Sequence, residues 1–325
     1  MNKINRNFKK CLITGIAGAG GSYLAEYILN YNRKIKIFGF YRSAGNKRLL
    51  EQKYKKKIKF YKLDLNNFKN LKKTLKKIKP DLIYNFASNP DVRLSFDFPK
   101  EIINSNYNST LNLLEAVRVL KLKTLIIHCS TSEVYGNVLP HEVPIKEDLK
   151  MRPVSPYAVS KAYQDISAQM YSQVYNLEII ITRMFTYINP RRNNLFQSAF
   201  ALQILKIKNR KNKVLKHGNL NSIRSFLSLN DAMKAYWLVA KKGKVGEIYN
   251  IGGTKAFTVK EVLNKLLDIS RVKVKKKIDK KLIRIKDVTL QLPNIKKFSR
   301  DTGWKQKESL NNSLKNLLQE LSNQV

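Results

Sequence analysis

Cysteine and histidine are scarce in this sequence, which limits the kinds of site it can build. Its 325 residues include two cysteines, Cys11 and Cys129, and three histidines. Both cysteines fall in apolar segments that predict buried strands, so neither a disulfide framework nor a metal cluster is expected. His128 lies inside one of these segments and is predicted to be a core residue rather than a metal ligand. These scarcities predict a reduced, cytoplasmic protein with no metal site.

Acidic residues are also few, and long apolar runs are lacking. Lysine and arginine number 63 against 23 acidic residues, a formal net charge of +40. No apolar run reaches the roughly 20 residues that a membrane-spanning helix needs. So basic a chain suggests nucleic acid or an anionic membrane surface as a partner. Its lysines, however, are spread along the sequence, and asparagine and isoleucine are enriched with them, as an A+T-rich genome would produce. We therefore predict no membrane and no specific nucleic-acid partner, only incidental adhesion to polyanions.

Glycine is sparse as well, with 13 residues, yet several lie together near the amino end. Residues 10–14 predict a short buried strand and residues 22–29 an amphipathic helix. Between them stand Gly15, Gly18 and Gly21, which allow a tight turn, the close approach of a pyrophosphate and close packing of helix on strand. The alternative is a signal peptide, which is disfavoured because glycines break the apolar run and an acidic residue lies in the helix. The segment therefore predicts a dinucleotide-binding turn.

The end of the next predicted strand, residues 35–41, bears on which dinucleotide binds. An NAD-preferring site would place an acid there for the ribose 2′-hydroxyl. Here Arg42 follows, with Lys47 and Arg48 close behind. A guanidinium can pair with a 2′-phosphate through its planar fork, so we predict NADP, with NAD as the alternative. Arg42 could equally be one of many basic residues that face water.

Strands alternate with helices along the rest of the first half. Strands are predicted at residues 58–63, 81–88 and 124–129, and helices at 71–78 and 105–120. This alternation predicts an α/β fold, a Rossmann-type doubly wound parallel sheet with ligands at the carboxyl ends of its strands. Asp64 and Leu65 follow one such strand as candidate contacts for the adenine edge, and Ala87 follows another as a candidate for the nicotinamide-side ribose. Each could equally be a turn or packing residue.

Two motifs in the middle of the chain carry groups suited to chemistry. Thr131, Ser132 and Glu133 follow one predicted strand, and Tyr157 and Lys161 stand four residues apart on a predicted helix. Side chains at that spacing share a helix face, so Lys161 can lower the proton affinity of Tyr157 and orient a sugar or a nicotinamide ribose. Tyrosine and lysine are so abundant here that this spacing is weak evidence alone. It gains weight from the dinucleotide turn upstream.

Taken together, these motifs resemble the extended short-chain dehydrogenase/reductase family of nucleotide-sugar enzymes, over almost the whole chain. Within that family the chain is most similar to GDP-mannose 4,6-dehydratases. The segments that carry this likeness are 13–16 (ITGI), 21–26 (GSYLAE), 131–133 (TSE), 153–157 (PVSPY) and 189–192 (NPRR). Such an enzyme oxidises the hexose at C4 by hydride transfer to NADP, eliminates water across C5 and C6, and returns the hydride to C6.

The resemblance implies a role for each group in these motifs. Tyr157 is the expected base at the C4 hydroxyl, and Thr131 is expected to hydrogen-bond the same oxygen. Glu133 is the expected acceptor of the C5 proton, although it could also be an exposed glutamate at a strand end. Ser132 stands where some related dehydratases have an aspartic acid, so it is expected to relay a proton or to position water.

The second half of the chain is expected to supply the sugar-nucleotide site. Thr186 stands where the family usually has asparagine, in a segment that leads from the strand at 177–182 into the substrate lobe. Arg192, Arg224 and Arg284 are candidate diphosphate contacts, because planar and permanently charged donors suit two adjacent phosphates. The residue after Arg224 is a serine, where the family usually has an acid, which bears on how Arg224 is oriented.

These expectations predict a domain organisation. Residues 1–182 are predicted to form the NADP-binding domain, and residues 183–325 mainly a smaller sugar-nucleotide lobe. A segment at about 225–253 is expected to return to the first domain. The family resemblance also implies a homodimer or homotetramer, with the predicted helices 105–120 and 157–175 as the candidate contacts.

Three functions remain open at this point. The first is an NADP-dependent nucleotide-sugar 4,6-dehydratase acting on GDP-mannose. The second is a GDP-4-keto-6-deoxymannose reductase or a nucleotide-sugar 4-epimerase of the same family. The third is a non-catalytic binder of a dinucleotide or of nucleic acid. Glu133 favours the first, because simple epimerases of the family do not need this carboxylate.

Overall fold

The computed structural model describes residues 5–208, 213–283 and 285–322. Within these ranges the main element is a seven-stranded sheet in the order β3-β2-β1-β4-β5-β6-β9, with every neighbouring pair parallel. Its strands are β1 (Lys10–Thr14), β2 (Lys36–Tyr41), β3 (Ile58–Lys62), β4 (Leu82–Asn85), β5 (Leu125–Thr131), β6 (Ile179–Met184) and β9 (Ile248–Ile251). The strand order reverses between β1 and β4, as in the Rossmann fold, so the predicted fold class is confirmed.

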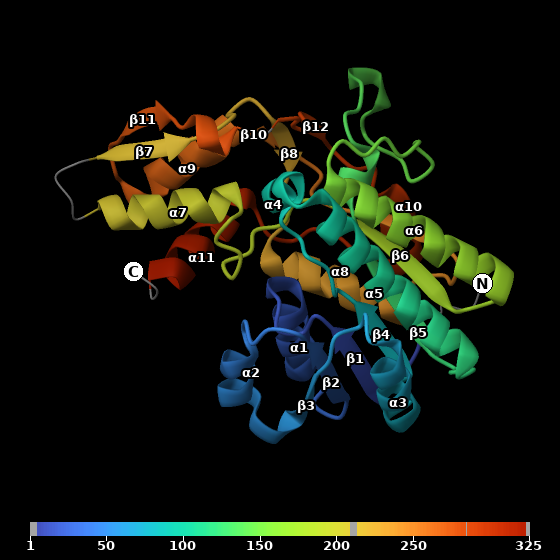
Figure 1. Cartoon of the computed structure of the whole chain (residues 1–325). Coiled ribbons are helices and arrows are strands. Elements are labelled where there is room, and N and C mark those ends of the chain that lie inside the picture. Colours follow the sequence, from blue (N-terminus) through green and yellow to red (C-terminus); the bar gives the residue numbers. More distant parts are fainter. Residues whose placement is uncertain (1–4, 209–212, 284, 323–325) are drawn as a thin grey trace.

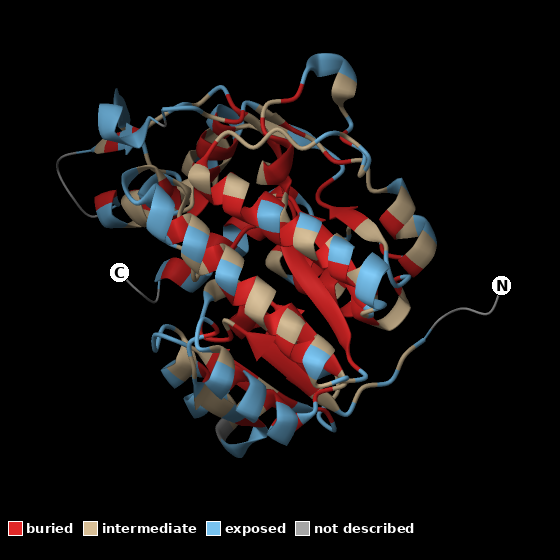
Figure 2. Ribbon diagram, turned by 45° about the vertical axis from the view of Figure 1, so that its right-hand side comes forward, coloured by how far each residue is buried: buried red, intermediate tan, exposed pale blue. Residues whose placement is uncertain are grey.

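Helices cover both faces of this sheet, and the strands between them are buried (Figures 1 and 2). On one face lie α1 (Ala19–Tyr31), α2 (Lys47–Tyr54) and α8 (Leu229–Lys242), and on the other lie α3 (Phe68–Ile78), α5 (Pro99–Val119) and α6 (Pro156–Tyr175). Side chains alternate along β1. Cys11 and Ile13 therefore lie in the core between the sheet and α1, α2 and α8, while Leu12 lies in the core between the sheet and α3, α5 and α6. A sheet buried on both faces explains why its strands read as nearly continuous apolar runs.

A smaller lobe is formed largely by the carboxyl-terminal part of the chain (Figure 1). Its apolar core lies between α7 (Phe196–Ile207), α9 (Val259–Ser270) and α11 (Leu310–Ser322). Two small sheets complete it, β7 (Val214–His217) with β11 (Lys275–Ile278), and β8 (Ile223–Ser225) between β10 (Ala256–Thr258) and β12 (Leu290–Gln291).

Short helical elements are found along the whole described chain. They are α4 (Val92–Asp97) and α10 (Lys296–Thr302), with 3₁₀ turns at Lys55–Lys57, Ser132–Tyr135, Pro140–Glu142 and Lys280–Leu282.

The chain crosses between these two parts more than once. After β8 it forms α8, which packs against α1, and then β9, which pairs with β6 at the edge of the large sheet. The predicted domain boundary at residue 182 stays a prediction.

The helix expected at 105–120 begins earlier, at Pro99. Proline suits the first turn of a helix, because the N–H that it lacks would make no helical hydrogen bond there.

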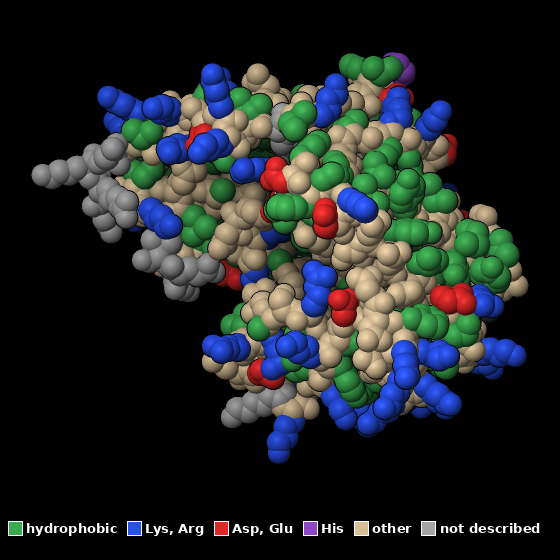
Figure 3. Space-filling view, in the orientation of Figure 1, with side chains coloured by type: hydrophobic (Ala, Val, Ile, Leu, Met, Phe, Trp, Pro, Cys, Tyr) green, Lys and Arg blue, Asp and Glu red, His purple; other side chains and the backbone are tan. Residues whose placement is uncertain are grey.

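Basic side chains are spread over the face seen in Figure 3 instead of forming one patch. Both cysteines are free and buried, and in the part of the chain that the structure describes no three His, Cys, Asp or Glu residues are grouped as a metal site. None of the described helices is both long enough and apolar enough to span a bilayer.

Candidate active site

A cavity of about 600 Å³ opens at the carboxyl ends of the central strands. It brings together nearly all the side chains that the sequence singled out. The predicted residues that line it are Gly15, Gly18, Gly21, Arg42, Asp64, Leu65, Ala87, Thr131, Ser132, Glu133, Tyr157, Lys161, Thr186 and Arg192. Segments far apart in sequence therefore form a single site, as expected where the strand order of a parallel sheet reverses.

The glycine turn is shaped so that side chains would not fit. Gly15 has φ +66°, and a Cβ there would lie 3.1 Å from the backbone of Ala87. A Cβ on Gly21 would lie 2.6 Å from the carbonyl oxygen of Gly15, which explains why α1 packs so closely on β1. Gly18 is the N-cap of α1 and provides no side chain to occupy the first N–H groups of the helix. The start of α1 thus offers backbone donors and a positive dipole end to an anion in the cavity.

The predicted adenine end of the cavity holds one exposed cation. The Arg42 side chain is exposed at the rim, and its Nη1 lies 3.5 Å from the hydroxyl oxygen of Ser105 on α5. Asp64 accepts the backbone N–H of Asn66 at 3.0 Å, so its carboxylate also shapes the turn after β3. Leu65 is buried beside it.

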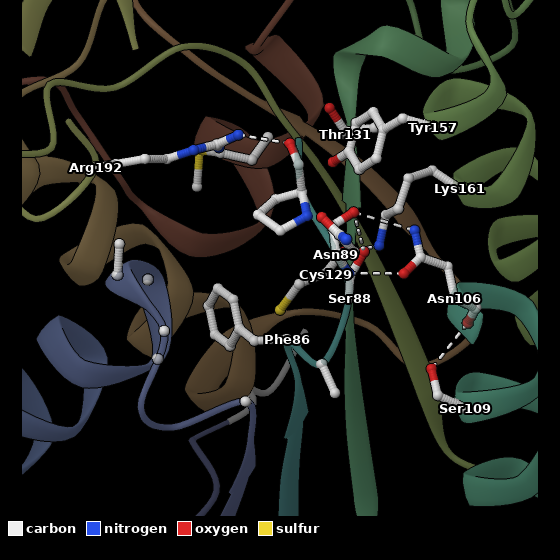
Figure 4. A pocket seen from close by; sticks show the side chains of 18 of the residues that line it. Phe86, Ser88, Asn89, Asn106, Ser109, Cys129, Thr131, Tyr157, Lys161 and Arg192 are labelled. Carbon is white, nitrogen blue, oxygen red and sulfur yellow. Dashed lines mark hydrogen bonds between the residues drawn. The ribbon is translucent and has the colours of Figure 1, made fainter. Parts of the chain in front are cut away.

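Tyr157 and Lys161 lie in the first turns of α6, which begins at an N-cap serine, Ser155, followed by a proline. Lys161 is only 4% exposed, and its Nζ donates to the carbonyl of Cys129 at 2.8 Å and to Oε1 of Gln164 at 2.6 Å. Burial lowers the pKa of Lys161 to about 8. Figure 4 shows Thr131, Tyr157 and Lys161 on one side of the cavity, with Arg192 extending from the opposite side.

The pKa of Tyr157 differs from the sequence expectation. Burial, together with the negative charge of Glu133, raises the pKa of Tyr157 to about 12, while Arg192 and a hydrogen bond with Thr131 act to lower it. Burial is the largest influence on this pKa, and the Lys161 ammonium donates to Cys129 and Gln164. In this structure the phenol is therefore protonated at neutral pH.

Glu133 and Ser132 are placed by a 3₁₀ turn directly after β5. Thr131 caps this turn, its Oγ1 accepting the N–H of Glu133 at 3.3 Å. Gly136 ends the turn with φ +62°, and a Cβ there would collide with the carbonyl of Arg152. The turn holds Ser132 buried and Glu133 half-buried at the cavity wall.

The arginines predicted to contact a diphosphate have different surroundings. Arg192 lines the cavity, and its Nη2 donates to the carbonyl of Pro90 at 2.7 Å while its Nε is buried without a partner. Arg224 is buried on β8, where it donates to the carbonyl of Val288 and lies 3.6 Å from a carboxylate oxygen of Asp287. The structure therefore holds Arg224 against the segment before β12 rather than on the cavity wall. Arg284 lies outside the described residues.

Several polar residues of the site were missed by the sequence reasoning. Gln164 holds the Lys161 ammonium and itself donates to the backbone carbonyl of Asn106 on α5. Asn106 donates to Ser160 and to the carbonyl of Asn89 at the cavity rim. The sequence signal for this network was the spacing of polar residues on the faces of α5 and α6 that otherwise carry apolar side chains.

His128 is a core residue, as predicted from its apolar strand. It lies 1% exposed on β5, and the Nδ2 of Asn85 lies 3.3 Å from its Nδ1. Burial, reinforced by the charge of Lys161, lowers the pKa of His128 to about 3. It is therefore neutral at every pH at which the protein is expected to work.

Comparisons with known proteins agree with this geometry. The family model described as GDP-mannose 4,6 dehydratase matches residues 12–317. The chain is 30% identical to the GDP-mannose 4,6-dehydratase of Vibrio cholerae serotype O1 over 302 residues, which cover 89% of this chain and 80% of that protein.

Two solved structures share the fold over nearly the whole chain. UDP-glucuronic acid 4-epimerase from Bacillus cereus, in complex with UDP-glucuronic acid and NAD, is 27% identical with a TM-score of 0.84, covering 96% of this chain and 99% of that one. RMD from Pseudomonas aeruginosa, complexed with NADPH, is 23% identical with a TM-score of 0.83, covering 98% and 100%, and supports the fold alone. The resemblance read from the motifs is confirmed, and the chain belongs to the GDP-mannose 4,6-dehydratase family of extended short-chain dehydrogenases/reductases.

Proposed function

We propose that this chain is an NADP-dependent dehydratase that converts GDP-mannose to GDP-4-keto-6-deoxymannose. The observation that carries the proposal is the placement of Thr131, Glu133 and Tyr157 on one cavity that also contains the glycine turn. An oxidation at C4 needs a base and a hydrogen-bond partner at the same hydroxyl. An elimination across C5 and C6 needs a carboxylate close by, and Glu133 supplies it.

The residues at the glycine turn fit a dinucleotide. Gly15 and Gly21 allow the turn to pack closely against the backbone of Ala87 and against α1. The start of α1 has no side-chain cap and offers N–H donors to a pyrophosphate. Arg42 at the rim favours a 2′-phosphate and therefore NADP over NAD. When bound, NADP supplies a hydride acceptor for C4, a positive charge on its nicotinamide, and the hydride that returns to C6.

Tyr157 is the group that accepts the proton of the C4 hydroxyl. Its pKa of about 12 means that it works as a base only with cationic help, which Arg192 supplies in part. Thr131 hydrogen-bonds the same substrate oxygen and holds it toward the phenol. Lys161 is placed by Gln164 and the Cys129 carbonyl to donate to a ribose or sugar hydroxyl beside Tyr157.

Glu133 carries out the elimination. Oxidation at C4 makes the C5 proton acidic, and the Glu133 carboxylate takes it while the C5–H electron pair forms the C5–C6 double bond. The C6–O bond breaks, and the departing hydroxide takes up that proton, with Ser132 positioned to relay it. One water is lost overall. When the hydride returns to C6, C5 takes up one proton, which is balanced by the proton that Tyr157 accepted from the C4 hydroxyl and then releases.

Mass spectrometry tests the proposal directly. The purified protein is incubated with NADP and GDP-mannose, and loss of one water from the sugar nucleotide is the expected result. Glu133→Gln should abolish dehydration while NADP and GDP-mannose still bind, because the substitution removes the base but leaves the shape of the cavity unchanged. If dehydration is absent but NADPH is consumed with a 4-keto-6-deoxy sugar nucleotide, the reductase is the function instead.

The assembly and compartment belong to the same proposal. An exposed apolar stripe on α6, made of Tyr163, Ile166, Met170 and Val174, runs beside α5 and favours a homodimer through these two helices. Tyr107 on α5 extends the stripe, its ring 5.7 Å from that of Tyr163. The two free, buried cysteines are in keeping with the reduced cytoplasm.

A further inference from the structure

One buried guanidinium is bonded to both segments that carry the catalytic groups. Arg183 on β6 is 2% exposed, and its Nε and Nη2 each lie 3.0 Å from a carboxylate oxygen of Asp165, which is fully buried on α6. Its Nη1 donates to the hydroxyl of Tyr135 at 2.9 Å and to the carbonyl of Glu147 at 2.8 Å. Neither Arg183 nor Tyr135 is among the residues that line the cavity, so any effect on the reaction passes through residues that do.

The Tyr135 hydroxyl is held from two sides. It accepts a hydrogen bond from Arg183 and donates to Oδ1 of Asn250 on β9 at 2.8 Å. Asn250 is itself fully buried, and its Nδ2 donates to the carbonyl of Ile145 at 2.9 Å. The Arg183 guanidinium also lies over the Tyr135 ring, 5.0 Å from its centroid, a favourable cation–π arrangement. A buried polar network whose members all have partners holds its side chains in one arrangement.

Tyr135 ends the 3₁₀ turn that carries Glu133. The other end of this turn follows β5, where Thr131 pairs with Met184 of β6. Within the turn, the carbonyl of Glu133 accepts the N–H of Gly136 at 3.1 Å. The backbone that bears the Glu133 carboxylate is therefore fixed at one end by the large sheet and at the other by Tyr135.

The start of α6 is attached to the same guanidinium by a separate bond. Asp165 follows Lys161 by one helical turn and Tyr157 by two, so its ion pair with Arg183 ties this part of α6 to β6. Removing the Tyr135 hydroxyl would leave that ion pair in place. The two attachments can thus be separated by substitution.

We propose that Tyr135 is a positioning residue for Glu133, its hydroxyl fixing the turn so that the carboxylate reaches C5 of the hexose. The assignment rests on the proposed function. Tyr135 contacts neither substrate nor cofactor in this role and transfers no proton. Tyr157 is positioned independently, through Asp165, so loss of the Tyr135 hydroxyl slows proton removal from C5 and not the oxidation at C4.

Tyr135→Phe tests the assignment, because it removes the hydroxyl and keeps the ring. The kcat for dehydration of GDP-mannose should fall about ten- to hundred-fold, the effect of a small misplacement of a catalytic group. The KM for GDP-mannose and the Kd for NADP should be unchanged. With GDP-mannose deuterated at C5 the isotope effect on kcat should be larger than in the parent enzyme, whereas deuterium at C4 should give no larger effect.

Arg183→Lys tests the same link from its other end. Lysine keeps a positive charge beside Asp165 but lacks the planar fork that bonds Asp165 and Tyr135 together. This variant should also show the larger isotope effect at C5. Cooperative thermal unfolding of each variant would show that the fold is retained.

A matched control lies on β9, beside Asn250. Tyr249 is fully buried, and its hydroxyl donates to a carboxylate oxygen of Asp301 at 3.0 Å and accepts the N–H of Lys244 at 3.0 Å. It is not among the residues that line the cavity. Tyr249→Phe therefore removes a buried hydroxyl with two hydrogen bonds, as Tyr135→Phe does, and should keep the kcat and isotope effects of the parent enzyme.

The outcomes separate this assignment from the proposed function. If the parent enzyme dehydrates GDP-mannose but Tyr135→Phe keeps its kcat, or loses kcat with no larger isotope effect at C5, the assignment is overturned and the dehydratase function stands. If the parent enzyme does not dehydrate GDP-mannose, the proposed function is wrong and the assignment fails with it.

Discussion

Replacing Lys161 with methionine should change how the stability of the protein depends on pH. The ammonium is buried, and burial lowers its pKa from the ordinary 10.5 to about 8. Between these two values the unfolded chain binds more protons at this site than the folded chain does. Folding therefore becomes more favourable with rising pH, as far as this one group is concerned.

The size of the effect follows from the two pKa values. Below pH 8 the lysine is charged in both states, and its burial destabilises the folded protein by about 3 kcal/mol, at 1.36 kcal/mol for each tenfold change in proton affinity. By pH 10 the folded-state group has lost its proton, and the cost falls to about 1 kcal/mol. The free energy of unfolding of the parent protein, taken relative to that of Lys161→Met, should therefore rise by about 2 kcal/mol between pH 7 and pH 10.

Urea unfolding of the parent and Lys161→Met at pH 7, 8, 9 and 10 measures this difference. Other groups titrate over this range, but they are common to both proteins and cancel. The variant also loses the hydrogen bonds of Lys161 to Cys129 and Gln164, which shifts its unfolding free energy but adds no pH-dependent term from another group. Parallel curves, with the difference in unfolding free energy constant within 0.5 kcal/mol or so, would refute the reasoning and mean that Lys161 keeps its ordinary proton affinity.

Two further predictions concern the cofactor and the assembly. Arg42→Ala should weaken NADP binding by about 10- to 100-fold, the value of one charge-assisted hydrogen bond, and leave NAD binding nearly unchanged; equal weakening of both in a calorimetric titration would contradict a 2′-phosphate contact. Ile166→Glu combined with Val174→Glu should convert the proposed dimer to a monomer in light scattering, because it buries charge in the apolar stripe of α6. Ile285→Glu, at an exposed apolar residue outside that stripe, is the control and should leave the assembly intact.

Local sequence patterns were enough to predict most of the large sheet and one wall of the cavity. At the start of α9, Thr258 and Glu261 form a capping box, each accepting the backbone N–H of the other, and such a pattern can be read from residues three positions apart. The glycine turn, the turn at Thr131–Glu133 and the spacing of Tyr157 and Lys161 were likewise readable, because each depends on neighbours within a few residues. Alternating strands and helices predicted the parallel sheet for the same reason.

Orientation within the site was less accessible. Lys161 shares a helix face with Tyr157, as its spacing predicts, but β5 and Gln164 determine where its ammonium donates. Burial raises the pKa of Tyr157 instead of letting Lys161 lower it, and burial is a property of the packed chain. Arg224 was predicted to contact phosphate by its residue type, yet Asp287 lies beside its guanidinium once β8 and β12 pair.

By itself, then, the sequence determined the fold class, the dinucleotide turn and the identity of the chemical groups at the end of β5 and the start of α6. Their spacing is short, so backbone geometry alone relates them. Only the tertiary structure decided which distant groups complete the site. Gln291 on β12 of the smaller lobe accepts the hydroxyl of Ser132 in the turn after β5, although 159 positions of the chain separate them. No periodicity in the sequence encodes such a contact.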